Sequence, residues 1–167
     1  MEKMQVQFSI GIEYAFHSLF YMVDLPPQKT IAIKEIARLN GIAETYLSKV
    51  FSKLRKAGIV RSVPGVKGGY DLARDAEEIS FWDIIVAIEG PSFFFRCAEI
   101  RKKNIFVDSP KAFTRKCPCL IKVVIQDAEE SMRNSMRAKS LSWLHDSVYK
   151  DFPDEKKLAI AAWSREI

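Results

Sequence analysis

The stretch VPGVKGGYDL, residues 63–72, limits the folds open to this chain more than any other segment. One proline and three glycines separate two runs of strand-forming residues, IVRSV at 59–63 and YDLA at 70–73. Such punctuation between short β-rich runs predicts a two-stranded hairpin. The only charged residue at its tip is Lys67. A hairpin alone does not reveal a function, so the neighbouring segments decide its interpretation.

Three helices are predicted before the hairpin, because apolar residues recur there at helical spacing. The first covers residues 8–23 and ends before Pro26 and Pro27, which cannot continue a helix. A short second helix covers 31–39 and stops at Asn40-Gly41, and a third covers 44–57 and stops at Gly58. The third helix should turn four apolar residues to the core: Leu47, Val50, Phe51 and Leu54.

Helices are also predicted after the hairpin. Ser80 is a good N-cap for a helix that closes at Gly90-Pro91. Residues 92–116 show no period and should form a long loop, whereas a long helix is expected over 118–139. That helix carries an apolar stripe of Ile121, Ile125, Ala128, Met132 and Met136. A shorter helix should follow from 141, and Pro153 should open the last one.

Positive charge is concentrated in one region. The chain has a formal net charge of +5, yet residues 29–74 contain ten basic and only three acidic side chains. A local excess of this kind is typical of proteins with a polyanionic partner, although a solvated basic surface would look the same. No run of eighteen apolar residues occurs and the N-terminus does not resemble a signal peptide. We therefore expect a cytoplasmic protein that does not enter a membrane and whose three cysteines stay reduced.

Helix, short turn, helix and hairpin is the order of a winged helix-turn-helix, so we predict a mostly α-helical fold with a small β-hairpin wing. The helix at 44–57 would lie in the major groove of double-stranded DNA, and the wing glycines would let the backbone approach a phosphate. The sequence contains no nucleophile elbow, phosphate loop or HExxH motif, so we expect a regulator and not an enzyme. The residues expected to face DNA are Thr45, Tyr46, Ser48, Lys49, Ser52, Lys53, Lys56, Lys67, Gly68 and Gly69.

The stretch YLSKVFSKLRKAGIVRSVPGVKGGYDLARDAEEISFWDIIVAIEG, together with FSIGIEYAFHSL near the start, resembles the IscR/NsrR/CymR family of bacterial winged-helix repressors. The resemblance extends over roughly residues 4–140 and implies a homodimer joined by a long helix. It divides the chain into a DNA-binding domain at 1–90, a sensor loop at 91–117, a dimerisation helix at 118–140 and a C-terminal helical tail at 141–167.

The resemblance also implies an iron–sulfur site. Cluster-binding members use three closely spaced cysteines, but here Cys97 is followed by RKKNIFVDSP, which has none. One branch of the family instead holds a [2Fe–2S] cluster on a Glu and a His four residues apart and on two more distant cysteines. Glu13, His17, Cys97 and Cys117 reproduce that spacing, with Glu13 and His17 supplied by the partner subunit. Cys119 could replace Cys117 as a ligand.

Several other interpretations of these residues remain open. Glu13 and His17 could be a surface pair one helical turn apart, and Cys97 could be a small buried apolar residue. The site could hold another metal or cluster, or the Cys117-Pro118-Cys119 sequence could act as a cluster-free thiol switch. The chain could also be a metabolite-responsive regulator, a small thiol redox enzyme, or a protein partner of a metabolic enzyme. The operator and the physiological signal cannot be read from the sequence.

Overall fold

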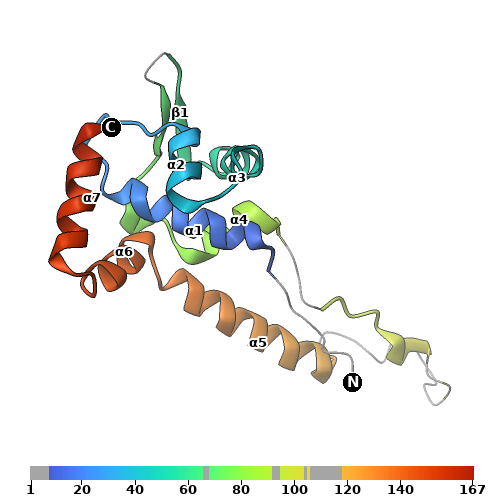
Figure 1. The fold of residues 1–167 in the computed structure, drawn as a ribbon. Coiled ribbons are helices and arrows are strands. Elements are labelled where there is room, and N and C mark those ends of the chain that lie inside the picture. The colour runs from blue at the N-terminus through green and yellow to red at the C-terminus, as the bar shows by residue number, and fades with distance from the viewer. Residues whose placement is uncertain (1–7, 66–67, 92–94, 104, 106–117) are drawn as a thin grey trace. The chain divides into compact units, whose positions relative to one another are not determined.

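The computed structural model describes residues 8–65, 68–91, 95–103, 105 and 118–167 (Figure 1). Its contacts divide the chain into two units, Met1–Gly90 with Met136–Ile167 and Pro91–Ser135. In the described residues, seven α-helices, two short 3-10 helices and one two-stranded antiparallel sheet are present. None of these helices combines the length and hydrophobicity of a membrane span.

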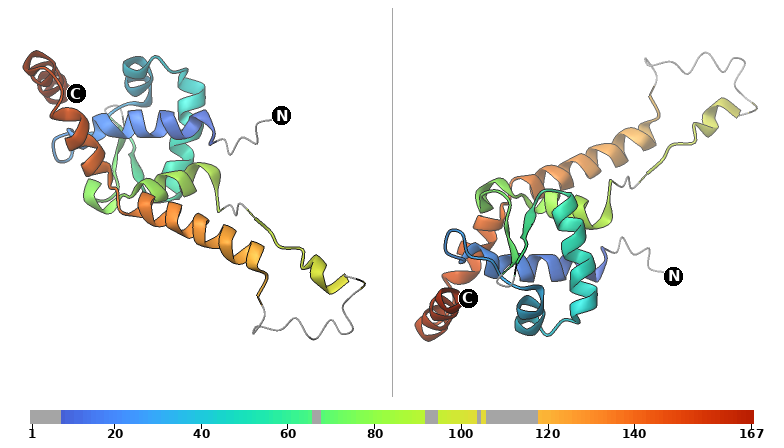
Figure 2. Two further views of the ribbon diagram at one scale, coloured as in Figure 1. Left: turned by 90° about the horizontal axis from the view of Figure 1, so that it is seen from below. Right: turned by 90° about the horizontal axis from the view of Figure 1, so that it is seen from above.

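The first unit is built around helix α1 (Ile10–Val23). Figure 2 shows α1 among α2 (Ile33–Asn40), α3 (Glu44–Lys56) and α4 (Phe81–Glu89), and it contacts all three of them. Ala15 and Leu19 on its inner face have no exposed surface. Gly41 ends α2 in the left-handed region, at φ 64°, which lets the chain turn directly into α3.

Strands β1 (Val60–Val63) and β2 (Gly69–Leu72) form the predicted hairpin, with Val60 opposite Leu72. The structure shows why two glycines follow its tip. A Cβ on Gly68 would lie 2.3 Å from the Val63 carbonyl oxygen, and a Cβ on Gly69 would lie 2.4 Å from the Ile31 oxygen. Both glycines are therefore needed for packing within the protein, a reason that the sequence did not suggest.

Helix α4 begins as its sequence predicts. The Ser80 hydroxyl accepts a hydrogen bond from the Asp83 backbone N–H at 3.1 Å, and the Asp83 carboxylate accepts from the Ser80 backbone N–H at 2.9 Å. This reciprocal capping box satisfies donors that a helix N-terminus otherwise leaves unpaired. A 3-10 helix, η1 (Ala76–Glu78), leads into it from the hairpin.

The C-terminal half contains α5 (Leu120–Arg137), α6 (Leu141–Tyr149) and α7 (Asp154–Glu166), close to the predicted boundaries. The expected loop at 92–116 lies partly outside the described residues. Where it is described, it contains a 3-10 helix, η2 (Ile100–Lys103), that the sequence pattern did not predict.

A buried histidine joins α1 to α6. His145 is 8% exposed and lies between the rings of Phe20 and Tyr149, with both ring centroids 5.0 Å away. Its Nε2 is 3.0 Å from Asp24 Oδ1, and its Nδ1 is 3.3 Å from Asp146 Oδ1. The hydrogen bond to the Asp24 carboxylate outweighs the effect of burial and raises the pKa of His145 above 6.5.

This histidine predicts a stability difference that depends on pH. Because the folded-state pKa is raised, the protonated pair stabilises the fold fully below pH 6.5 and less as pH rises through the folded-state value. Asp24→Asn should therefore lower the free energy of unfolding by about 1–2 kcal/mol at acidic pH, and by less at alkaline pH. Urea denaturation of both proteins across this pH range measures the difference, with Asp146→Asn as the control at an exposed partner. A difference that grows with pH would contradict the assignment.

Candidate DNA-binding surface and cysteine site

The outward face of α3 carries four of the residues predicted to face DNA. Leu47, Val50, Phe51 and Leu54 are buried against the core, as predicted. Helical geometry then turns a set spaced by four, three and four residues to the opposite face. This set is Thr45, Lys49, Ser52 and Lys56. Three of them are exposed and Ser52 is half-buried, so α3 presents hydroxyls and ammonium groups together.

Three other predicted contacts on α3 have partners inside the protein. The Tyr46 ring packs edge-on against Tyr14, with centroids 5.4 Å apart. Ser48 Oγ donates to the Glu44 carbonyl at 2.8 Å. Lys53 Nζ donates to the Ile88 carbonyl at 2.7 Å, which ties α3 to the last turn of α4.

Two arginines that were not among the predicted contacts lie at the hairpin, Arg61 on β1 and Arg55 near the end of α3. Arg61 on β1 makes a forked hydrogen bond to Asp71 on β2, with distances of 2.7–2.9 Å. Arg55 Nη1 lies 3.4 Å from Ser62 Oγ, so it reaches from α3 towards β1. Both belong to the basic segment 29–74, and this local excess of positive charge was the sequence feature that could have identified them. Lys67 lies outside the described residues.

Glu13 and His17 lie one turn apart on α1, and both are exposed. They belong to the first unit, whereas Cys97 and Cys119 belong to the second. A site that combines the two pairs therefore stays a prediction.

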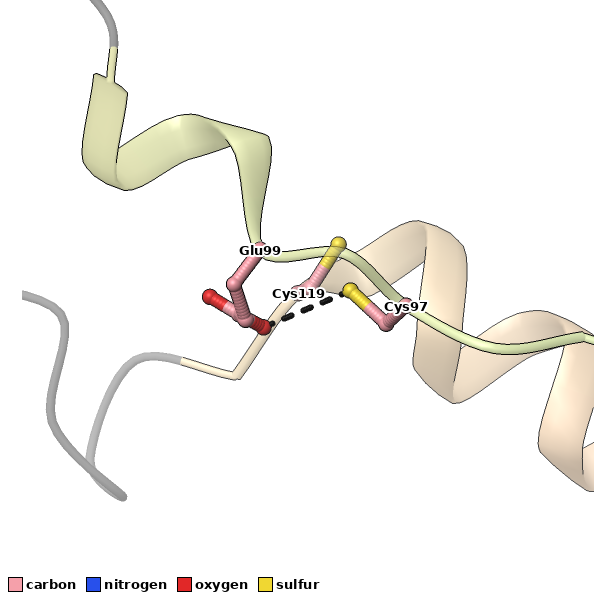
Figure 3. A group of neighbouring side chains, drawn as sticks. All are labelled: Cys97, Glu99 and Cys119. Carbon is pink, nitrogen blue, oxygen red and sulfur yellow. Dashed lines mark hydrogen bonds between the residues drawn. The ribbon is translucent and has the colours of Figure 1, made fainter.

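Two cysteines and one carboxylate come together in the second unit (Figure 3). The ligand atoms of Cys97, Glu99 and Cys119 all lie within 4.8 Å of one another. Cys97 Sγ donates to Glu99 Oε1 at 3.4 Å, and Arg101 Nη2 donates to Glu99 Oε2 at 2.8 Å. Cys117, the predicted ligand, lies outside the described residues.

The position of each cysteine gives it a different proton affinity. Cys119 directly precedes α5, and the Lys122 backbone N–H, with help from Cys97 and Arg101, lowers the pKa of its thiol. The Glu99 backbone N–H lowers the pKa of Cys97, but burial, the Glu99 carboxylate and Cys119 outweigh it, so that pKa is raised. Cys119 is therefore the thiol that ionises more readily.

The carboxylate of this group was missed in the sequence. Glu99 has a φ of 50°, a conformation that few residues other than glycine adopt. The sequence around Glu99 does not predict this conformation. Its spacing of two residues from Cys97 was the only available signal. The hydrogen bond from Arg101 lowers the pKa of Glu99, which keeps the carboxylate ionised beside the thiols.

The surroundings of the three residues are mostly apolar, with Arg96 and Arg101 as the charged exceptions. A pocket of about 590 Å³ at this site is lined by Phe95, Ile100, Leu120 and Ile121 as well as by the two cysteines. Thiolates select iron–sulfur clusters, zinc or copper(I), and a carboxylate can complete a zinc site. A [2Fe–2S] cluster requires four ligands, and Cys97 and Cys119 can supply two of them.

Comparison with known proteins gives consistent matches. The model of the Rrf2 family, described as an iron-dependent transcriptional regulator, matches residues 8–147. Protein rrf2 of Nitratidesulfovibrio vulgaris is 31% identical over 115 residues, which cover 69% of this chain and 71% of that protein. IscR of Vibrio vulnificus is 46% identical over 68 residues, which cover 40% of each chain.

Solved structures agree with these sequence matches. The structure of T. potens IscR matches with a TM-score of 0.63 at 26% identity, covering 91% of this chain and 96% of that one. Oxidized CymR of Staphylococcus aureus matches with a TM-score of 0.59 at 28% identity, covering 84% and 96%. The predicted winged helix-turn-helix fold is thereby confirmed.

Proposed function

Because this chain belongs to the Rrf2 family of transcriptional regulators, we propose that it is a homodimeric repressor whose affinity for operator DNA follows an iron–sulfur, redox or nitric-oxide signal. The observation that carries the DNA-binding part is the exposed face of α3, formed by Thr45, Lys49, Ser52 and Lys56 beside the hairpin. The major groove admits a helix, and a hairpin wing can follow the adjacent backbone.

Different residues have different roles in this arrangement. Lys49 and Lys56 neutralise phosphates, which positions the helix without reading sequence. Thr45 and Ser52 lie on the same face and reach base edges or phosphates. Tyr46, Ser48, Lys67, Gly68 and Gly69 complete the proposed surface. Lys53 can reach a phosphate only by giving up its hydrogen bond to the Ile88 carbonyl.

The salt dependence of binding separates these roles. Each lost phosphate contact lowers the slope of log affinity against log salt by about 0.9. The double variant Lys49→Ala/Lys56→Ala should therefore bind the upstream DNA of its own gene more weakly, with a slope lower by about two units. Gel shifts at several salt concentrations measure it. Lys150→Ala, at an exposed lysine after α6, is the matched control.

In the same assay, Lys53→Ala should keep the slope of the wild type, because its ammonium is held by α4. An unchanged slope in the double variant would remove α3 from the proposed DNA surface.

Helix α5 is the proposed dimer contact. Leu120, Ile121 and Val124 on this helix are 75%, 65% and 66% exposed, and Glu129 is its only buried residue. A helix that exposes so many apolar side chains requires a partner surface. Two copies of α5 would pair two DNA-binding units, which then meet half-sites about 34 Å apart.

Charge placed on the apolar stripe of α5 should separate the subunits. Ile125→Glu/Met132→Glu should sediment as a monomer and bind operator weakly, because two carboxylates would be buried in the interface. Gln126→Glu, at an exposed position on the same helix, should leave the dimer intact. Dimers of the double variant would place the interface elsewhere.

We further propose that Cys97 and Cys119 of one chain, and Glu13 and His17 of its partner, hold a [2Fe–2S] cluster, with Cys117 as the competing thiol ligand. The proximity of the two sulfurs in an apolar pocket supports this choice. When bound, such a cluster supplies one-electron redox chemistry. The Glu99 carboxylate accepts the hydrogen bond of Cys97 Sγ and is stabilised as the anion by Arg101, so it would orient this thiol, whose proton would pass to solvent when Cys97 becomes a ligand.

Iron and sulfide analysis tests the cluster. Protein purified without oxygen should be coloured and contain about two iron and two sulfide ions per chain. Cys97→Ser and His17→Ala should lose most of both, and Cys119→Ser should lose more than Cys117→Ser. The reverse order for the last two variants would return the role to Cys117.

A thiol switch is the second candidate, because Cys97 and Cys119 are already close enough to approach a disulfide. Oxidation would join the two sulfurs, with two protons and two electrons passing to an oxidant such as a peroxide or an organic disulfide. Protein that stays colourless after reconstitution with iron and sulfide would exclude the cluster and favour this switch.

A further inference from the structure

A groove of about 610 Å³ lies on the first unit, on the side of α1 that faces α6 and α7. Its volume falls within the range of small-molecule sites in proteins. The family match ends at residue 147, whereas Val148, Phe152 and Lys156 also line the groove. This chain therefore completes the groove with a segment outside the family match.

Aromatic rings form much of the groove lining. Phe16 and Phe81 lie with their centroids 4.3 Å apart and their planes inclined by 36°. Phe20 and Phe152 follow further along the groove, with centroids 6.0 Å apart. These surfaces suit a flat apolar body, which can stack on one ring and contact the edge of another.

Besides Tyr21, three polar side chains line the same groove: Glu13, His17 and Lys156. Lys156 Nζ lies 3.6 Å from the centroid of the Phe152 ring, a cation–π contact that holds the ammonium group at the aromatic lining of the groove. Within the described part of the chain, the side chains of Glu13, His17 and Lys156 make no ion pair or hydrogen bond with another residue. In the cluster-free protein, their hydrogen-bonding capacity is thus available to a ligand.

The order of these groups along α1 limits the charge of the ligand. Phe152 packs on Phe20, so Lys156 belongs with that part of the helix, whereas Glu13 lies seven residues earlier, or about 10 Å along the axis. A carboxylate on the ligand would meet the ammonium of Lys156. A second negative charge at the other end would meet the Glu13 carboxylate and be repelled.

From this arrangement we propose that the groove is a binding site for a small organic monoanion with a planar apolar body, of the arylcarboxylate class. Lys156 pairs with the carboxylate, and Phe16, Phe20, Phe81 and Phe152 enclose the ring system. Glu13 selects against dianions. The proposal goes beyond the regulator function and concerns the cluster-free protein, in which Glu13 and His17 are not engaged as cluster ligands, and binding is measured without DNA.

The probe is 2-naphthoate, titrated by calorimetry onto the purified full-length protein in its iron-free form. Wild type should bind one molecule per chain, and naphthalene-2,6-dicarboxylate should bind at least several-fold more weakly. Lys156→Ala should weaken 2-naphthoate binding by about tenfold, since a charge-assisted hydrogen bond is lost. Lys150→Ala, at an exposed lysine that does not line the groove, should bind as wild type does.

Two further comparisons test the role of charge. Glu13→Gln should bring the affinity for the dicarboxylate close to that for 2-naphthoate. Lys156→Glu should lose 2-naphthoate and gain binding of the cation 2-naphthylmethylammonium, which shows that the variant groove is intact. The proposal fails if wild type shows no saturable binding at millimolar 2-naphthoate, if the Lys156 and Lys150 variants bind alike, or if neutral 2-naphthol binds as tightly as the anion.

Discussion

The first unit depends on the burial of α1. This helix contacts α2, α3, α4, α6 and β2, so most elements of the unit share its surface as part of their core. Small residues allow the close approach. A Cβ on Gly11 would lie 3.2 Å from the Ile88 side chain of α4 and 3.5 Å from the Tyr46 hydroxyl of α3, so α1 packs against both helices with no space left at this position. Helix α3 with its exposed face, the capped helix α4 and the helix α6 that carries the buried histidine all pack on α1.

Local signals in the sequence were sufficient where neighbouring residues decide the structure. Ser80 and Asp83 cap α4 in the predicted place, and Gly41 takes the left-handed conformation that ends α2. The partners of Lys53 and the reason for Gly69 could not be found in this way, because Ile88 and Ile31 are distant in sequence. Nor could Glu99 be selected, since its carboxylate reaches the cysteines only through an unusual backbone angle. The spacing of hydrophobic residues predicts helices and strands. Contacts between residues distant in sequence depend on how those helices and strands pack, which the spacing does not predict.

The contacts of α3 describe a path from its surface to the end of the first unit. Lys53 binds the Ile88 carbonyl, and the next residue, Glu89, accepts hydrogen bonds from both the backbone N–H and the hydroxyl of Ser9 at 2.9 and 2.6 Å. The last turn of α4 is therefore tied to α3 and to the start of α1. The cysteine-bearing unit begins two residues after Glu89, at Pro91. The Lys53 hydrogen bond therefore joins α3 to the part of the first unit that directly precedes the cysteine-bearing unit in sequence.

The contact between Gly69 and Ile31 has a consequence for how binding specificity can change. The hairpin is hydrogen-bonded to Ile31 in both directions through Tyr70, at 2.9 Å each way, and Gly69 leaves no room for a side chain between the two backbones. Main-chain atoms therefore help to set the angle at which the hairpin leaves the protein, together with the packing of the Tyr70 ring on Phe51. Under the proposed function, substitutions on the exposed face of α3 change the groups offered to the bases and leave these main-chain hydrogen bonds untouched. Recognition and framework would then be separable, which makes the α3 face a suitable place to redesign the proposed choice of DNA.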